Sequence, residues 1–219
     1  MTKAFIVLGT PRSGTSLVAG MLHNGGTRMG YLLNRPQPAN PAGFFEDMEF
    51  IWINQAILES VGCAWNLPPS DEKMAELGQS NATDVVRTLV GDKQSNAEEQ
   101  GWDAWGFKDH RAYLLLPLYA PVLAELDCHF VYIHRNPLAV ALSFVRAWPD
   151  LFPNVARALV VIGVYQLRIA SFLMAHEWQV THTTFESLTD TPDESVATLA
   201  EALGVDLARD HLDPGLRHF

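Results

Sequence analysis

Residues 9–16, which run Gly-Thr-Pro-Arg-Ser-Gly-Thr-Ser, have the composition of a loop that binds an anion. They follow an apolar run over residues 3–8 and lead into a segment of helical character. At such a junction, backbone N–H groups and the helix dipole both point toward an anion. The spacing of glycines and hydroxyls matches the phosphate-binding Walker pattern, except that Thr15 replaces its lysine. Arg12 supplies a cation inside the loop, and its guanidinium can bind two oxygens of a phosphate or sulfate.

A second cation stands where a metal-dependent nucleotide hydrolase would have an aspartate. The apolar run over residues 130–134 leads directly into Arg135. A nucleoside triphosphatase needs a carboxylate at this kind of strand end to hold magnesium. Arg135 therefore indicates that this strand end binds a second anion rather than a metal ion.

Apolar runs and helical periodicities alternate along the chain. Strands are predicted over residues 3–8, 105–108, 129–134 and 179–183, and helices over residues 15–22, 46–61, 113–126, 138–148, 155–175 and 193–203. This alternation is typical of an α/β protein whose central parallel sheet is covered by helices on both faces. With the phosphate loop after the first strand, it predicts a three-layer α/β/α fold of the P-loop NTPase-like kind.

The length of the chain favours one hydrophobic core. We expect a single domain over residues 1–219, because 219 residues is the size of one large globular domain. Residues 62–101 are the least regular part and become polar toward their end. We expect an inserted helical segment there that acts as a lid.

Charge and composition exclude several classes of partner. The formal net charge of −10 has the wrong sign for a protein that coats nucleic acid or an anionic membrane. Two cysteines cannot form a dense disulfide framework and favour a reducing compartment. The scattered histidines lack the spacing of a metal site. The longest later apolar run, residues 158–167, is about half a membrane span, and no signal-peptide cleavage site follows the first one. We expect a cytoplasmic protein with no metal, nucleic acid or membrane.

Several motifs occur in the order found in one enzyme family. Residues 10–16 form the first motif, and Arg135-Asn136-Pro137, followed by Ser143, form another. They resemble the 5′-phosphosulfate loop and the 3′-phosphate element of the sulfotransferases, which transfer a sulfuryl group from 3′-phosphoadenosine 5′-phosphosulfate (PAPS) to an acceptor. Residues 40–47, 105–111 and 184–188 also resemble segments of this family, so the resemblance covers nearly the whole chain.

The resemblance implies a set of residues that bind the donor and act on it. The residues that it assigns to PAPS are Pro11, Arg12, Ser13, Gly14, Thr15, Ser16, Arg135 and Ser143. An acceptor hydroxyl or amine would attack sulfur in line, which requires positive charge at the leaving group and a base. Arg12 and Lys108 are the catalytic cations, and no metal is implied. The acceptor, a small molecule or carbohydrate, would be bound by residues 27–45, 62–101 and 148–154.

Two residues are candidates for the base. Glu46 follows a glycine-aromatic turn at the start of a predicted helix, where several sulfotransferase subfamilies have a catalytic glutamate. His110 is in register with the histidine of the cytosolic enzymes, and histidine suits proton transfer near neutrality. The sequence leaves both open, although the proline that related bacterial chains have at the position of His110 favours Glu46.

Two other functions are compatible with the same loops. A degenerate nucleotide kinase would bind a nucleotide together with magnesium. A regulatory protein would bind the nucleotide without turning it over. Arg135 at the strand end argues against the kinase, and the two candidate bases argue against a pure binding protein.

Overall fold

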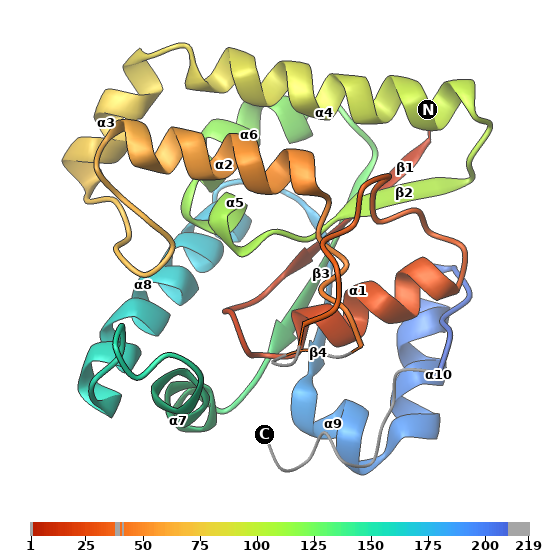
Figure 1. The fold of residues 1–219 in the computed structure, drawn as a ribbon. Coiled ribbons are helices and arrows are strands. Elements are labelled where there is room, and N and C mark those ends of the chain that lie inside the picture. Colours follow the sequence, from red (N-terminus) through yellow and green to blue (C-terminus); the bar gives the residue numbers. More distant parts are fainter. Residues whose placement is uncertain (1, 38–39, 41, 210–219) are drawn as a thin grey trace.

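The computed structural model describes residues 2–37, 40 and 42–209. Four parallel strands form one sheet in the order β2-β1-β3-β4. The strands are β1 (Lys3–Leu8), β2 (Ala104–Phe107), β3 (Cys128–His134) and β4 (Gln179–Thr184). Helices cover both faces of the sheet (Figure 1). The structure therefore confirms the predicted α/β fold with a central parallel sheet between two helical layers.

The two faces of β1 belong to two separate hydrophobic cores, because successive side chains of a strand point to opposite faces. Phe5 and Val7 belong to the core that contains residues of α1 (Thr15–Asn24), α9 (Phe185–Asp190) and α10 (Pro192–Leu203). Ile6 and Leu8 belong to the larger core on the other face. The helices that contribute to this larger core are α2 (Met48–Ser60), α3 (Asp71–Gln79), α4 (Ala82–Glu99), α5 (His110–Leu114), α6 (Leu116–Leu123), α7 (Pro137–Ala147) and α8 (Val155–Met174).

The segment over residues 62–101 is helical, as expected, and its longer helix is part of the larger layer. α4 packs against α6 and α2. The side-chain amide of Gln94 donates to the backbone oxygen of Thr2 at 3.1 Å and accepts from the indole nitrogen of Trp105 at 2.7 Å. These bonds tie α4 to the start of the chain and to β2. Its function as a lid stays a prediction.

Several predicted helix boundaries differ from the structure, and two of these differences affect the site. The helix predicted over residues 113–126 is two helices, α5 and α6, which meet at Leu115. Pro117 lies in the first turn of α6, where the N–H that it lacks is not needed, so a new helix begins there. The helix predicted to start at residue 46 starts at Met48, because the carboxylate of Asp47 caps it by accepting from the backbone nitrogen of Glu49 at 3.0 Å. Glu46 therefore precedes the helix.

α8 is longer than the apolar run that the sequence suggested. Among the described residues, α8 is the one helix that is long and apolar enough to cross a membrane. This criterion uses length and composition alone. α5, α6 and α7 pack against one side of it. Its two arginines contact loop residues, Arg157 through the backbone oxygen of Asn66 at 3.0 Å and Arg168 through the backbone oxygen of Pro69 at 3.3 Å. The expectation of no membrane partner stays a prediction.

Candidate functional site

The strand order brings three chemistry-bearing segments to one edge of the sheet. Residues 9–16 follow β1, Lys108 follows β2, and Arg135 follows β3. β1 lies between β2 and β3 in the sheet. The carboxyl ends of parallel strands meet at one edge, and ligands of such folds bind there. The fold thus brings together the segments that the sequence analysis selected.

The loop over residues 9–16 is tight enough to require its glycines. A Cβ atom at Gly9 would lie 2.6 Å from the hydroxyl of Ser13, and one at Gly14 would lie 2.7 Å from the ring of Phe185. Gly14, with a φ of 101°, and Arg12, with a φ of 66°, are left-handed. A left-handed arginine is uncommon, and such strain concentrates at functional sites.

Ser13 has a buried hydroxyl without a hydrogen-bond partner in the described part of the chain. The residue is only 1% exposed. Leaving a buried polar group unpaired costs free energy, so such a group is usually explained by a ligand or by function. This hydroxyl fits a loop that is completed by an anion.

The residues assigned to the two phosphates of PAPS are in direct contact. Nε of Arg12 donates to the hydroxyl of Ser143 at 3.0 Å, and Nη1 of Arg135 donates to the backbone oxygen of Arg12 at 2.8 Å. The guanidinium of Arg135 also lies 4.0 Å from the ring centroid of Phe185. The sequence analysis did not select Phe185, although it quoted the segment that contains it.

Both guanidinium groups are partly withdrawn from water. Burial, together with the charge of Arg146, lowers the pKa of Arg12. Burial also lowers the pKa of Arg135, partly offset by Glu186 and assisted by Arg12. Both side chains stay charged, so the lowered pKa values express the cost of holding two cations close together away from water. A bound anion would relieve that cost.

Lys108 connects the phosphate loop to the candidate base Glu46. Its ammonium donates to Oε1 of Glu46 at 2.7 Å, to the hydroxyl of Ser16 at 3.2 Å and to the backbone oxygen of Phe44 at 3.2 Å. The side chains of Lys108 and Glu46 are each 4% exposed. Lys108 therefore forms a buried ion pair beside the loop.

Glu46 and His110, the two alternative bases, contact each other. Nδ1 of His110 lies 3.3 Å from Oε1 of Glu46. Burial alone would raise the pKa of Glu46, but Lys108 and His110 together outweigh it and hold this pKa well below its usual range. Glu46 is therefore a carboxylate that only accepts hydrogen bonds. It favours the His110 tautomer with the proton on Nδ1 and the lone pair on Nε2.

Asp109 fixes the segment that carries Lys108 and His110. It is fully buried. Its carboxylate accepts from the backbone and guanidinium nitrogens of Arg111 at 3.2 and 2.9 Å and from the side chain of Asn54 at 2.9 Å. The hydroxyl of Tyr119 donates to Asn54 at 2.7 Å. The sequence analysis quoted Asp109 and Arg111 within a motif but gave them no function, and nothing local marked Asn54.

A second buried ion pair fixes the residue after Glu46. Asp47 accepts from the ammonium of Lys93 at 2.8 Å and from the backbone nitrogen of Tyr31 at 3.2 Å. Burial alone would lower the pKa of Lys93, but its hydrogen bonds to Asp47 and Glu49 raise it. On the other side of Glu46, Phe45 is left-handed with a φ of 53°. The backbone on both sides of Glu46 therefore has a defined conformation.

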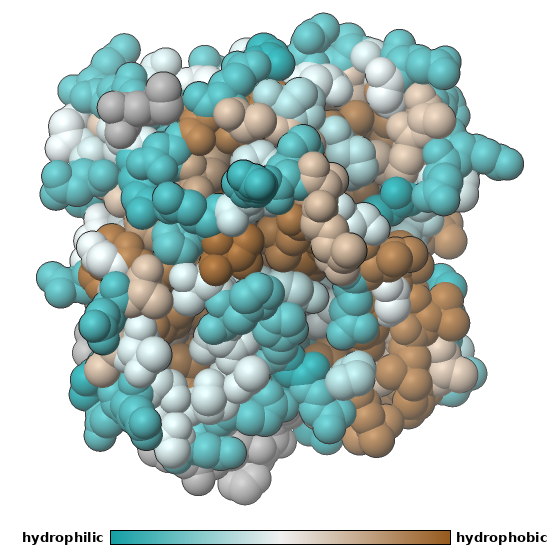
Figure 2. Space-filling model, turned by 180° about the vertical axis from the view of Figure 1, so that it is seen from behind, coloured by the Kyte–Doolittle hydropathy of each residue, from teal (hydrophilic) through white to brown (hydrophobic). Residues whose placement is uncertain are grey.

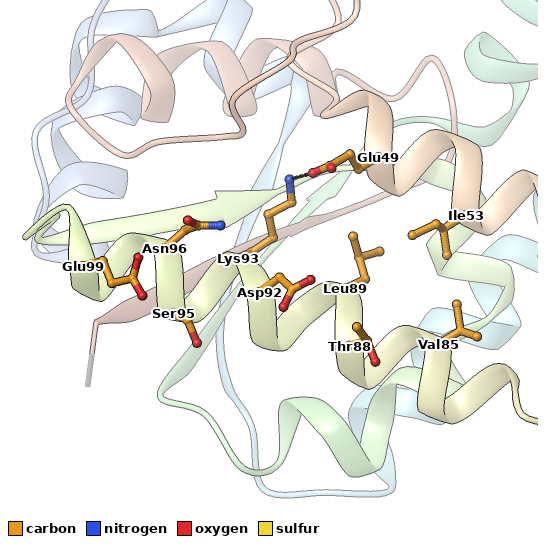
Figure 3. A pocket seen from close by; sticks show the side chains of 10 residues that line it. All are labelled: Glu49, Ile53, Val85, Thr88, Leu89, Asp92, Lys93, Ser95, Asn96 and Glu99. Atoms are coloured by element: carbon orange, nitrogen blue, oxygen red, sulfur yellow. Dashed lines mark hydrogen bonds and ion pairs between the residues drawn. The ribbon is translucent and has the colours of Figure 1, made fainter.

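Lys93 also borders a groove of about 510 Å³ between α2 and α4, and its ammonium points toward Glu49 (Figure 3). The residues that line the groove are Glu49, Ile53, Val85, Thr88, Leu89, Asp92, Lys93, Ser95, Asn96 and Glu99. No residue assigned to PAPS or to catalysis is among them. The groove therefore lies outside the candidate site.

Aromatic side chains border His110. The ring of Trp65 meets that of His110 edge-on at 5.6 Å between centroids, and it meets that of Trp148 at 4.8 Å. Tyr165 donates from its hydroxyl to the backbone oxygen of Trp65 at 2.9 Å. Trp65, Trp148 and Phe44, whose carbonyl contacts Lys108, come from the three segments expected to bind the acceptor.

Three groups of the site lie close enough to share a metal ion. Ligand atoms of Glu46, Asp109 and His110 lie within 4.8 Å of one another. Glu46 already accepts the ammonium of Lys108, whose charge would repel a metal cation, and Asp109 already accepts from Asn54 and Arg111. The expectation of no metal stays a prediction.

A parallel sheet, a glycine-rich loop after its inner strand β1 and cations at neighbouring strand ends form a site whose chemistry suits an anion. The family model described as "Sulfotransferase domain" matches residues 2–219. The chain belongs to the sulfotransferase family, as the motifs in its sequence indicated.

Solved structures show the same fold at low sequence identity. The sulfotransferase domain from the curacin biosynthetic pathway is 18% identical with a TM-score of 0.57, over 98% of this chain and 78% of that one. The sulfotransferase domain of the Synechococcus PCC 7002 olefin synthase is 18% identical with a TM-score of 0.58, over 100% and 88%. A sulfotransferase from Mycobacterium tuberculosis H37Rv is 16% identical with a TM-score of 0.53, over 100% and 71%. Sulfotransferases have the P-loop NTPase-like fold, which was the predicted class. A comparison with curated protein sequences gave no significant match.

Proposed function

We propose that this sulfotransferase uses PAPS as its donor and transfers the sulfuryl group to a hydroxyl or amine of a small-molecule or carbohydrate acceptor. Family membership supports sulfuryl transfer. The donor is inferred from one observation: the guanidinium of Arg135 donates to the backbone oxygen of Arg12, another partly buried arginine, beside the unpaired, buried hydroxyl of Ser13. Such a site suits a ligand with two separate anionic groups.

The residues divide into two anion sites. The backbone of residues 9–16, with Arg12 and Ser13, would hold the 5′-phosphosulfate. Arg135 and Ser143 would hold the 3′-phosphate, which an ordinary nucleoside triphosphate lacks. When bound, PAPS supplies an activated sulfuryl group and a phosphate that leaves as an anion. Lys108, next to Ser16, is placed to stabilise negative charge on that side.

The geometry favours His110 as the base, whereas the sequence alone favoured Glu46. The carboxylate of Glu46 is occupied by Lys108, and its lowered pKa makes it a weak base. Glu46 instead orients the imidazole of His110 through its contact with Nδ1. The acceptor proton would move to Nε2 of His110, in the arrangement that a carboxylate and histidine adopt in other enzymes.

The acceptor side of the proposed site has an aromatic border. Trp65 and Trp148 meet close to His110, so an acceptor with an apolar or planar part would find contacts there. This arrangement is compatible with small molecules and with sugars, whose apolar faces pack on aromatic rings. The cytoplasmic location stays part of the proposal.

Calorimetric titration tests the donor. Adenosine 3′,5′-bisphosphate should bind without added metal, and more tightly than adenosine triphosphate with magnesium. Arg135→Ala should weaken the bisphosphate by about 10- to 150-fold, the equivalent of the roughly 1.5–3 kcal/mol of a charge-assisted hydrogen bond, and should weaken adenosine 5′-phosphate much less. Arg87→Ala is the matched control, because Arg87 pairs with Glu125 on the surface.

Two outcomes would contradict the proposal. A preference for the triphosphate with magnesium would indicate a kinase. Tight binding of the bisphosphate without transfer from PAPS to any acceptor in a broad panel of alcohols, phenols, sugars and amines would indicate a binding protein.

A further inference from the structure

The outer face of α8 is uncharged along its whole length and mostly apolar. Its exposed residues are Ala156, Leu159, Val160, Gly163, Gln166, Leu167, Ala170, Ser171 and Met174. The helix is described from end to end, and none of these residues carries a charge. The two arginines of α8, Arg157 and Arg168, bond to the backbone oxygens of the loop residues Asn66 and Pro69 instead. Spread over residues 156–174, the face is about 27 Å long at 1.5 Å per residue.

α7 extends this face to a second helix. Leu138 and Leu142 are about half exposed on α7, which packs against α8. Seen from behind, hydrophobic residues gather at the lower right, over the part of the surface that α7 and α8 form (Figure 2). Single exposed apolar residues are ordinary, but a contiguous apolar face of this kind marks an interaction site.

We infer that the α8 face binds the α8 face of a second copy of this chain, with the two helices antiparallel around Gly163. The reason is the symmetry of the pattern. Ala156, Leu159, Gly163, Leu167 and Ala170 are spaced by three, four, four and three residues, so the stripe reads the same from either end. A twofold interface must complement itself, and this stripe does so.

In that arrangement each of the five stripe residues finds a partner of its own type. Leu159 packs against the partner's Leu167, and Ala156 packs against the partner's Ala170. Gly163 meets its own counterpart, and the lack of side chains there lets the two helices approach closely. A Cβ added at Gly163 would have no atom of this chain within 4 Å, so packing within the monomer does not demand a glycine.

The lack of charge on the α8 face makes it the place where a second copy is opposed least. Each copy has a formal net charge of −10, so two copies repel each other wherever charged surfaces meet. The uncharged α8 face is where that repulsion is weakest.

Sedimentation equilibrium over a wide range of concentration tests the assembly. The wild type should be a dimer, and Leu167→Glu should weaken the dimer by at least about a hundredfold, because each copy would then bury an unpaired carboxylate against the partner's Leu159. Trp52→Glu is the matched control, since Trp52 is 56% exposed on another helix, and it should leave the dimer intact. A monomeric wild type, or a dimer that survives Leu167→Glu, would overturn the proposal.

A single engineered cysteine tests the twofold axis. The two native cysteines, Cys63 and Cys128, are buried. Under mild oxidation Gly163→Cys should form a covalent dimer, because the new thiol meets its own counterpart. Gly91→Cys is the control, because Gly91 is also an exposed helical glycine with open space around it, and it should stay uncrosslinked. If Gly163→Cys does not crosslink, the antiparallel register is wrong.

Lipid is the other possible occupant of this face. Flotation with phosphatidylcholine vesicles should leave the wild type in solution. Binding to vesicles that Leu167→Glu abolishes, in a protein that sediments as a monomer, would replace the second copy with a lipid surface and overturn the proposal.

Discussion

The buried ion pair between Lys108 and Glu46 should show strong coupling in a double-mutant cycle. The two groups are 2.7 Å apart and their side chains are each 4% exposed. The substitutions Glu46→Gln, Lys108→Met and both together remove either charge or the whole pair. Each single change leaves one buried charge without its partner, whereas the double change leaves none.

The expected magnitudes follow from the neighbours that each charge keeps. Breaking a buried pair from one side costs about 3–5 kcal/mol. Lys108 would keep Ser16 and Phe44 as acceptors, and Glu46 would keep His110, so we expect the lower end, about 3 kcal/mol for each single variant. The double variant should lose no more than about 4 kcal/mol, which leaves a coupling energy of about 2 kcal/mol.

Urea unfolding at neutral pH, followed by tryptophan fluorescence, measures the three free energies. The free energy of unfolding should fall with urea concentration at the same slope in the wild type and in all variants, so that the midpoints can be compared. Additive losses, to within about 0.5 kcal/mol, would show that the pair contributes no coupling and would refute the reasoning.

Three further predictions concern the same region. Ser13→Ala should leave the free energy of unfolding unchanged or raise it by up to about 1 kcal/mol, because the hydroxyl has no partner, yet it should weaken binding of adenosine 3′,5′-bisphosphate; a large loss of stability in thermal unfolding would contradict this. The folded pKa of Glu46 lies below its unfolded value of about 4.3, so its stabilisation is present above that pH and lost below it; urea midpoints of the wild type should fall more steeply than those of Glu46→Gln from about pH 5 to about pH 3. Lys93→Met should lower kcat with little change in KM for PAPS, because Asp47 next to Glu46 loses its ion pair; an unchanged kcat would show that this pair does not position Glu46.

The strands β1 and β3 were predictable because buried parallel strands are continuous apolar runs. β1 has its predicted limits, and β3 differs by one residue at its start. The phosphate loop and Arg135 were equally visible, since each follows such a strand and carries its own local signature. The family resemblance added Ser143, which contacts Arg12 in the structure.

Features that depend on contacts distant in sequence were not predictable. Asn54 supports Asp109 across 55 positions, and Lys93 reaches Asp47 across 46. Nothing near Asn54 or Lys93 in the chain distinguishes them from ordinary helix residues. Trp65 lies in an irregular loop, where periodicity gives no information, and only the fold places it beside His110.

The anchoring of that loop on α8 bears on how the acceptor range could be changed. Tyr165, Arg157 and Arg168 donate to the backbone oxygens of Trp65, Asn66 and Pro69 at 2.9, 3.0 and 3.3 Å. Because this backbone is already ordered, little conformational entropy remains to be lost when an acceptor arrives. The site would then select acceptors by how well their shape fits the rigid aromatic border formed by Trp65 and Trp148. An engineer who seeks broader specificity would therefore loosen the helix side chains that hold the loop, and would accept weaker binding of each acceptor in exchange.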